Sequence, residues 1–84
     1  MARVLVVEDE EAISELLSYN LKKEGFTVTV VDDGDDALIT VEEETPDIIL
    51  LDWMLPNVSG VEIARQLRAR PQTKSIPIIM LTAR

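Results

Sequence analysis

Apolar residues along the chain gather in four short runs, at residues 3–7, 26–31, 47–51 and 76–81. The runs are rich in Val, Ile and Leu and are too short for helices, so each predicts a β-strand. Between them, apolar residues recur every three or four positions, which predicts helices over about 11–24, 35–43 and 60–70. The pattern therefore predicts strands and helices in strict alternation, beginning and ending with a strand.

Local signals set the limits of the predicted helices. Gly25 and Pro71 stop the first and third helices, Asp33 caps the second, and Ser59 with Glu62 has the spacing of a capping box. We expect each helix to bury one apolar stripe. The stripes are Ile13, Leu16, Leu17 and Leu21; Ala37, Leu38 and Val41; and Val61, Ala64 and Leu67.

The run at 47–51 is the most informative of the four. It lies between Pro46 and Asp52 and reads as a strand buried on both faces, as in the interior of a parallel sheet. After Asp52 the chain carries proline, asparagine, serine and glycine, which predicts a loop. Alternating strands and helices with short connections form α/β folds in which helices cover both faces of a parallel sheet.

Composition narrows the range of chemistry. The chain has 84 residues, no cysteine and no histidine, so we expect one domain without disulfides, thiolate zinc sites or imidazole bases. Any bound metal must take oxygen ligands, which favours magnesium, calcium or manganese. A net charge of −8 argues against nonspecific binding of nucleic acid. With no signal peptide and no apolar segment of membrane-spanning length, we expect a soluble cytoplasmic protein without membrane contact.

Acidic and hydroxyl side chains stand at the ends of three predicted strands. Glu8 and Asp9 follow the first, Asp52 ends the third and Thr82 follows the fourth. If these strands are neighbours, the side chains meet at one edge, where ligands of open α/β sheets gather. Three close carboxylates repel one another unless a cation lies among them, and Mg²⁺ suits such a set. A carboxylate beside Mg²⁺ can accept a phosphoryl group, to which Thr82 could donate a hydrogen bond.

Three segments carry a family resemblance. Residues 6–10 (Val-Val-Glu-Asp-Glu), 46–56 (Pro-Asp-Ile-Ile-Leu-Leu-Asp-Trp-Met-Leu-Pro) and 76–84 (Ile-Pro-Ile-Ile-Met-Leu-Thr-Ala-Arg) resemble the receiver domain of bacterial two-component response regulators. The similarity is closest to the winged-helix (OmpR/PhoB) class and, within it, to regulators of the phosphate regulon. It implies a three-layer CheY-like, flavodoxin-like α/β fold whose sheet has the strand order 2-1-3-4.

The resemblance also implies a role for each candidate residue. Asp52 matches the phosphoacceptor and is also a metal ligand, Asp9 matches the direct Mg²⁺ ligand, and Glu8 matches the acid that reaches the metal through water. The main-chain carbonyl of Met54 matches a further metal ligand, and Thr82 matches the switch hydroxyl. A sensor histidine kinase would supply the phosphoryl group to control transcription. Such a domain is not an enzyme beyond its own phosphorylation and dephosphorylation, and DNA would be bound through a separate C-terminal domain.

The family pattern continues beyond the 84 residues. Residues 1–84 match the N-terminal part of a receiver, without the fourth helix, the fifth strand with its lysine, or the fifth helix. The strand at 76–81 would then form an exposed apolar edge, so we expect a homodimer or a segment-exchanged oligomer. A second hypothesis is a truncated folding fragment or engineered half-receiver that is oligomeric and does not transfer phosphoryl groups.

Other interpretations compete with these roles. Glu8 and Asp9 also suit the start of a helix, Asp52 suits a loop cap, and Thr82 suits the end of any strand. A haloacid-dehalogenase-like phosphatase would need a second acid two residues after its nucleophile, and Met54 stands there. A nucleotide-binding module would need a glycine-rich phosphate loop, which the sequence lacks.

Overall fold

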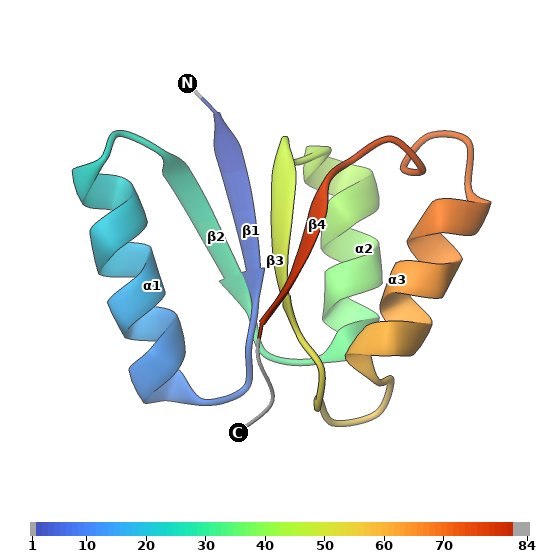
Figure 1. Ribbon diagram of the computed structural model, residues 1–84, viewed down its shortest axis with the longest axis horizontal. Helices are drawn as coiled ribbons and strands as arrows, with labels where there is room; N and C mark the ends of the chain where they lie inside the picture. Colours follow the sequence, from blue (N-terminus) through green and yellow to red (C-terminus); the bar gives the residue numbers. More distant parts are fainter. Residues whose placement is uncertain (1, 82–84) are drawn as a thin grey trace.

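The computed structural model describes residues 2–81 of the chain, and its strands and helices alternate as predicted (Figure 1). The elements are β1 (Arg3–Val7), α1 (Glu11–Lys23), β2 (Thr27–Val31), α2 (Gly34–Glu44), β3 (Ile48–Asp52), α3 (Gly60–Ala69) and β4 (Ile78–Leu81). β4 begins two residues later than the sequence predicts, because Pro77 has no main-chain N–H for a strand ladder.

The four strands form one parallel sheet in the order β2-β1-β3-β4. This is the order expected from the family resemblance. Helix α1 flanks the sheet on one side, and α2 and α3 flank it on the other, which gives three layers (Figure 1). The carboxyl ends of all four strands point to the same edge, at the bottom of Figure 1.

The main core lies between the sheet and helices α2 and α3. Leu5 and Val7 of β1 and Ile49 and Leu51 of β3 point to this side and are at most 1% exposed. They pack against buried side chains of the two helices, which are Ala37, Val41, Ile63 and Leu67. This layer carries most of the fully buried apolar area and hence most of the hydrophobic stabilisation.

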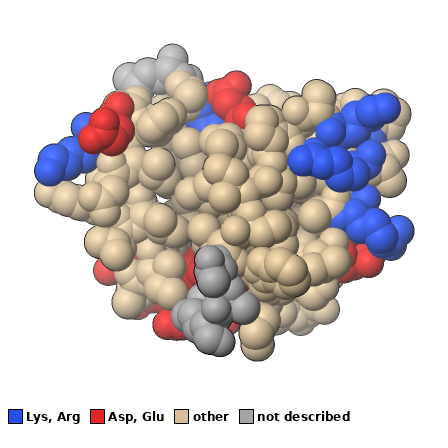
Figure 2. All heavy atoms as spheres, in the orientation of Figure 1, with Lys and Arg blue, Asp and Glu red and all other residues tan. Residues whose placement is uncertain are grey.

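The opposite face of the sheet is covered less evenly. Val4 and Val6 of β1 are buried, whereas Ile48 and Leu50 of β3 are half-buried and Ile79 of β4 is 50% exposed. The prediction that the 47–51 strand is buried on both faces is therefore wrong for one face. The reason is that, within residues 2–81, the helix on this side packs on β1 and β2. Figure 2 shows mostly uncharged atoms across the middle of the molecule, with Lys and Arg mainly on the right, the side of α3, and a smaller group at the left margin.

Two predicted helix stripes are rotated in the structure. Val61 is 52% exposed, whereas Ile63 and Leu67 are buried, so the predicted stripe of Val61, Ala64 and Leu67 is wrong at its first position. Gly60 packs against the end of β3 and fixes the phase of α3, and Val61 follows it by about 100° around the helix axis. In α1, Leu16 is 62% exposed because Ser14, two residues earlier, is the buried position.

Polar contacts define the helix ends. The Asp33 carboxylate accepts a hydrogen bond from the Asp36 N–H at 2.9 Å, which confirms Asp33 as the cap of α2. The Ser59 hydroxyl accepts one from the Glu62 N–H at 3.2 Å, while the Glu62 side chain binds Arg65 and Gln66. The predicted capping box is thus half formed.

Arg68 secures the connection between α3 and β4. Its Nη1 donates to the main-chain oxygens of Lys74 and Ile76, at 2.9 and 2.8 Å. One guanidinium therefore joins the last turn of the helix to the approach of the edge strand.

Candidate functional site

The carboxyl ends of β1 and β3 bring three acids together. β1 and β3 are hydrogen-bonded neighbours, so Glu8, which follows β1, and Asp52, which ends β3, emerge at the same edge. Carboxylate oxygens of Glu8, Asp9 and Asp52 all lie within 4.8 Å of one another. The structure thus brings these three residues together, as the sequence led us to expect, while their roles as metal ligands and phosphoacceptor remain predictions.

Two of these three carboxylates are buried. Glu8 and Asp52 are each 1% exposed, whereas Asp9 is exposed. Burial of a charged group is costly unless hydrogen bonds or a counter-charge compensate it. The Glu10 N–H donates to Glu8 Oε2 at 3.0 Å, and the Met54 N–H donates to Asp52 Oδ1 at 3.3 Å. These main-chain donors offset part of the cost and fix the orientation of both carboxylates.

Of the two remaining predicted site residues, the structure describes Met54 but not Thr82. Met54 lies in the loop after β3, with its side chain in solvent (67% exposed) and its N–H bonded to Asp52. The role of its carbonyl as a metal ligand stays a prediction. Thr82 lies outside the described residues, so its predicted role has no structural test.

A second acidic group lies beside the three carboxylates. Oxygens of Asp32, Asp33 and Asp36 are also within 4.8 Å of one another, and Asp32 and Asp36 share a pocket with Glu8 and Asp9. The nearby Asp33 carboxylate raises the pKa of Asp36 above its ordinary value of 3.8. The sequence alone does not point to this second group as a site, because nothing local shows that the end of β2 adjoins the end of β1.

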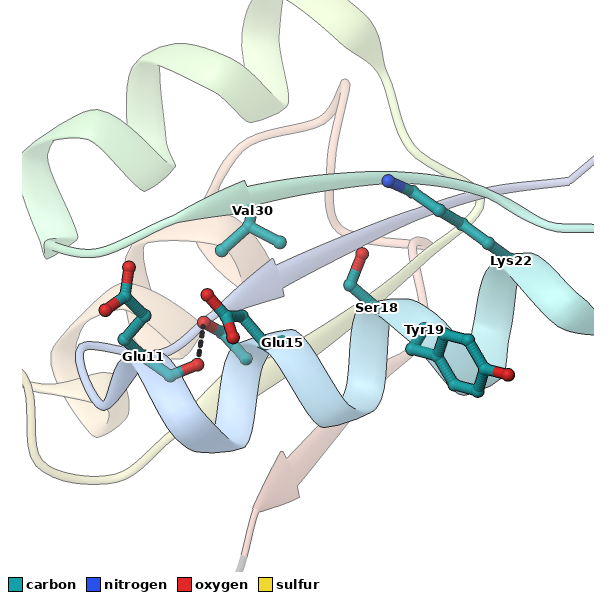
Figure 3. Close-up of a pocket in the computed structure, with 7 residues that line it drawn as sticks. Glu11, Glu15, Ser18, Tyr19, Lys22 and Val30 are labelled. Carbon is teal, nitrogen blue, oxygen red and sulfur yellow. Dashed lines mark hydrogen bonds between the residues drawn. The ribbon is translucent and has the colours of Figure 1, made fainter.

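A groove runs along α1 next to this edge (Figure 3). Val30 of β2 faces the helix there, with Glu11 and Glu15 near the start of α1 and Lys22 near its end. The Ser14 hydroxyl inside the groove donates to the Glu11 carbonyl at 3.1 Å. The groove therefore has a mixed lining and contains no convergent set of ligands comparable to the three carboxylates.

The three carboxylates fit a magnesium ion. Ligand oxygens on an octahedral Mg²⁺ stand about 2.1 Å from the metal and hence about 3 to 4 Å from one another. Mutual distances within 4.8 Å leave room for direct ligands together with one that acts through water. A set made of carboxylates alone is also the chemistry that a hard cation prefers.

The structure also bears on membrane contact. Within residues 2–81, each helix falls short of the length and apolar character needed to cross a bilayer.

Sequence comparison finds a family match over almost the whole chain. The family described as the response regulator receiver domain matches residues 4–84. The phosphate regulon transcriptional regulatory protein PhoB of Rhizobium meliloti is 57% identical over 84 residues, and the chain spans 37% of its length. The alkaline phosphatase synthesis transcriptional regulatory protein PhoP of Bacillus subtilis is 49% identical over 82 residues, and the chain spans 33% of its length.

Solved structures agree with this result. The N-terminal domain of a response regulator receiver protein from Methanoculleus marisnigri aligns with a TM-score of 0.94 at 30% identity, covering 100% of this chain and 68% of that one. A receiver domain of a sensor histidine kinase from Pseudomonas aeruginosa, described with a magnesium ion coordinated in its active site cleft, aligns with a TM-score of 0.93 at 35% identity. That alignment covers 98% of this chain and 67% of the other.

Proposed function

The chain belongs to the response regulator receiver domain family, and we propose that it accepts a phosphoryl group on Asp52, in the presence of Mg²⁺, from a sensor histidine kinase. One observation carries the proposal, which is the convergence of Glu8, Asp9 and Asp52 within 4.8 Å at the carboxyl edge of the sheet. The structural relative described with magnesium in its cleft supports the choice of metal.

Each acid has a distinct part in the proposed reaction. Mg²⁺ would be held by Asp9, Asp52, Glu8 and the Met54 carbonyl. When bound, it would offset the negative charge of the carboxylates and the phosphoryl oxygens. An oxygen of Asp52 attacks the phosphorus of the donor. A new P–O bond forms, the P–N bond to the donor histidine breaks, and the departing imidazole keeps the electron pair. The Met54 N–H, which donates to Asp52 Oδ1, orients the carboxylate for this attack.

The finer aspects of the function are also proposals. We assign Thr82 as the hydroxyl that contacts the phosphoryl group, and the phosphate regulon as the process controlled. The relatives support the second assignment by name, and the chain spans 37% and 33% of their lengths. DNA binding, dimerisation and the regulated genes are properties of a whole regulator. The cytoplasmic location stays a prediction.

Phosphorylation of Asp52 can be measured directly. We expect acetyl phosphate with Mg²⁺ to add one phosphoryl group to the wild-type chain, seen by mass spectrometry, and none to Asp52→Asn. Trp53 is the single tryptophan and follows Asp52, so beryllofluoride with Mg²⁺ should change its fluorescence. Asp47→Asn is the matched control, since Asp47 lies just before the same strand at its other end, and it should react as the wild type does.

A second function has one observation in its favour. Ile79 is 50% exposed on β4, and Leu50 beside it is half-buried, as on a sheet that associates with a second copy. Under this alternative the chain is an oligomer that does not transfer phosphoryl groups. An unchanged mass and unchanged fluorescence in this chain, with another receiver responding under the same conditions, would favour this alternative.

A further inference from the structure

Gly60, the first residue of α3, lies against the main chain at the end of β3. A Cβ atom at this position would stand 2.0 Å from the Asp52 carbonyl oxygen, 2.9 Å from the Asp52 carbonyl carbon and 3.1 Å from Trp53 Cα. The Gly60 N–H also donates to the Trp53 carbonyl at 3.0 Å. The start of α3 is therefore in direct main-chain contact with the residue proposed to receive the phosphoryl group.

The space around Gly60, and not its backbone conformation, demands a glycine. Gly25 shows the opposite case, with a left-handed φ of 99° and nothing within 4 Å of the place where a Cβ would stand. Gly60 has no such φ, but the atoms that a Cβ would meet belong to the main chain of residues 52 and 53. A main chain within a sheet cannot rotate aside as a flexible side chain can, so a methyl group at residue 60 must displace the end of β3 or the start of the loop.

Displacement at this point would reach the site directly. The Trp53 and Met54 peptides follow the displaced carbonyl, and the Met54 N–H is the donor to Asp52 Oδ1. Both the direction of the Asp52 carboxylate and the place of the Met54 main chain therefore depend on how closely α3 approaches β3.

We propose that Gly60 is a positioning residue for the phosphoacceptor site. Through its close contact with the Asp52 carbonyl, Gly60 fixes the orientation of the Asp52 carboxylate and the position of the Met54 main chain. The inference rests on the proposed function of Asp52. It assigns to α3 a part in the chemistry of a site whose acids all come from β1 and β3 and the residues after them.

Gly34 supplies a matched control. It is the first residue of α2, and a Cβ there would stand 2.7 Å from both Cβ and O of Val58 and 3.0 Å from Ile63 Cδ1. Both glycines are the first residue of a helix, and a Cβ at either position would meet the segment 52–59. At Gly34 this contact is with Val58, six residues along the chain from Asp52. Gly34→Ala should disturb packing without turning the Asp52 carboxylate.

The first experiment compares Mg²⁺ binding with stability. Mg²⁺ is titrated against the Trp53 fluorescence of the wild type, Gly60→Ala and Gly34→Ala, and urea unfolding of each is measured in parallel. Supporting groups behind metal ligands typically change metal affinity by about 10- to 100-fold. We expect a Kd at least about tenfold higher for Gly60→Ala and less than about twofold higher for Gly34→Ala. Equal affinities for the wild type and Gly60→Ala, or equal losses in both variants, would overturn the proposal.

The second experiment needs no metal and separates this inference from the proposed function. In metal-free chains, we expect the Met54 amide proton to shift and to exchange faster with solvent in Gly60→Ala, and to stay unchanged in Gly34→Ala. If the wild type fails to bind Mg²⁺, the proposed function fails, and the Met54 amide still decides the positioning role. If Gly60→Ala stays unfolded even in trimethylamine N-oxide while Gly34→Ala folds, Gly60 serves folding and the positioning role is refuted.

Discussion

At the carboxyl edge of the sheet, the carboxylates of Glu8, Asp9 and Asp52 lie close together even though main-chain N–H groups donate to two of them, whereas toward the amino edge an acid meets a donor or a cation. Asp47 there accepts a hydrogen bond from the Arg3 N–H at 2.7 Å, and Glu42 pairs with Arg70 at 2.6 Å. The paired acids at the amino edge favour the folded state, whereas three carboxylates held close together at the carboxyl edge disfavour it. Arrangements of this kind are typical of functional sites, where stability is given up for chemistry.

The largest expected effect comes from neutralising the carboxyl edge with metal. A ligand that binds the native state alone stabilises it by about 2.7 kcal/mol when its free concentration is 100 times its Kd. We therefore expect saturating Mg²⁺ to raise the free energy of unfolding of the wild type by about that amount, and EDTA to reverse it. Urea unfolding followed by circular dichroism measures both. Mg²⁺ that stabilises Asp52→Asn equally would show that the ion binds elsewhere.

At the amino edge, one contact is made by a buried hydroxyl. Thr73 is 2% exposed, and its Oγ1 donates to the Leu67 carbonyl at 2.7 Å. Thr73→Val keeps the shape and leaves that carbonyl without this donor, so we expect a loss of about 1–2 kcal/mol in urea unfolding. The neighbouring exposed Gln72 is the control, and Gln72→Ala should change stability by less than about 0.5 kcal/mol.

The two edges should respond with opposite sign to the same chemical change. Asp52→Asn removes one of three crowded charges and, without Mg²⁺, should raise the free energy of unfolding by about 1 kcal/mol. Asp47→Asn weakens a paired acceptor and should lower stability slightly, by about 0.5 kcal/mol. Both variants can be measured by urea unfolding in EDTA. A loss of stability in Asp52→Asn would mean that the three acids do not repel one another as their distances suggest.

The smallest effect is the pH dependence of the second acidic group. Repulsion from Asp33 raises the pKa of Asp36, so the folded chain binds this proton more readily than the unfolded chain. Stability should therefore fall as pH rises from the ordinary value of 3.8 through the raised pKa, and Asp36→Asn should remove that part of the slope. Thermal unfolding between pH 3 and 7 measures the slope.

Glu62 gives the control of opposite sign for this experiment. Its hydrogen bonds with Arg65 and then Gln66 lower its pKa from 4.5 to about 2. Its contribution is fully present above pH 4.5 and is lost as pH falls through about 2, so Glu62→Gln should lower stability near neutral pH and remove this part of the loss in acid. The same slope in the wild type and in both variants would show that neither group matters to stability.

Features governed by neighbours in sequence could be predicted well. The four strands follow from short apolar runs, the three helices from apolar residues at helical spacing, and the Asp33 cap from the residue type at the helix start. Each of these signals lies within a few residues of the sequence. The meeting of Glu8 with Asp52 followed from one further rule, that parallel strands end at the same edge, applied to strands taken as neighbours. The strand order itself came from the family resemblance, because local sequence patterns do not show which distant strands pair with one another.

Features set by distant contacts could not be predicted. The phase of α3 depends on Gly60 resting on the Asp52 carbonyl, so the stripe drawn through Val61 missed the buried Ile63. The nearness of Asp32 and Asp36 to Glu8 depends on the path of the loop after β2. The partial exposure of Leu50 depends on which strands α1 covers. In each case the surroundings of the residue come from another part of the chain, which local patterns in the sequence do not show.

The contacts of Arg68 at the entrance to the edge strand have a consequence for local opening. The same Nη1 atom binds two main-chain oxygens of the connection, so both are released together when the Arg68 side chain leaves. Opening of β4 from its amino end therefore requires the loss of two hydrogen bonds at once, and both have a charged donor.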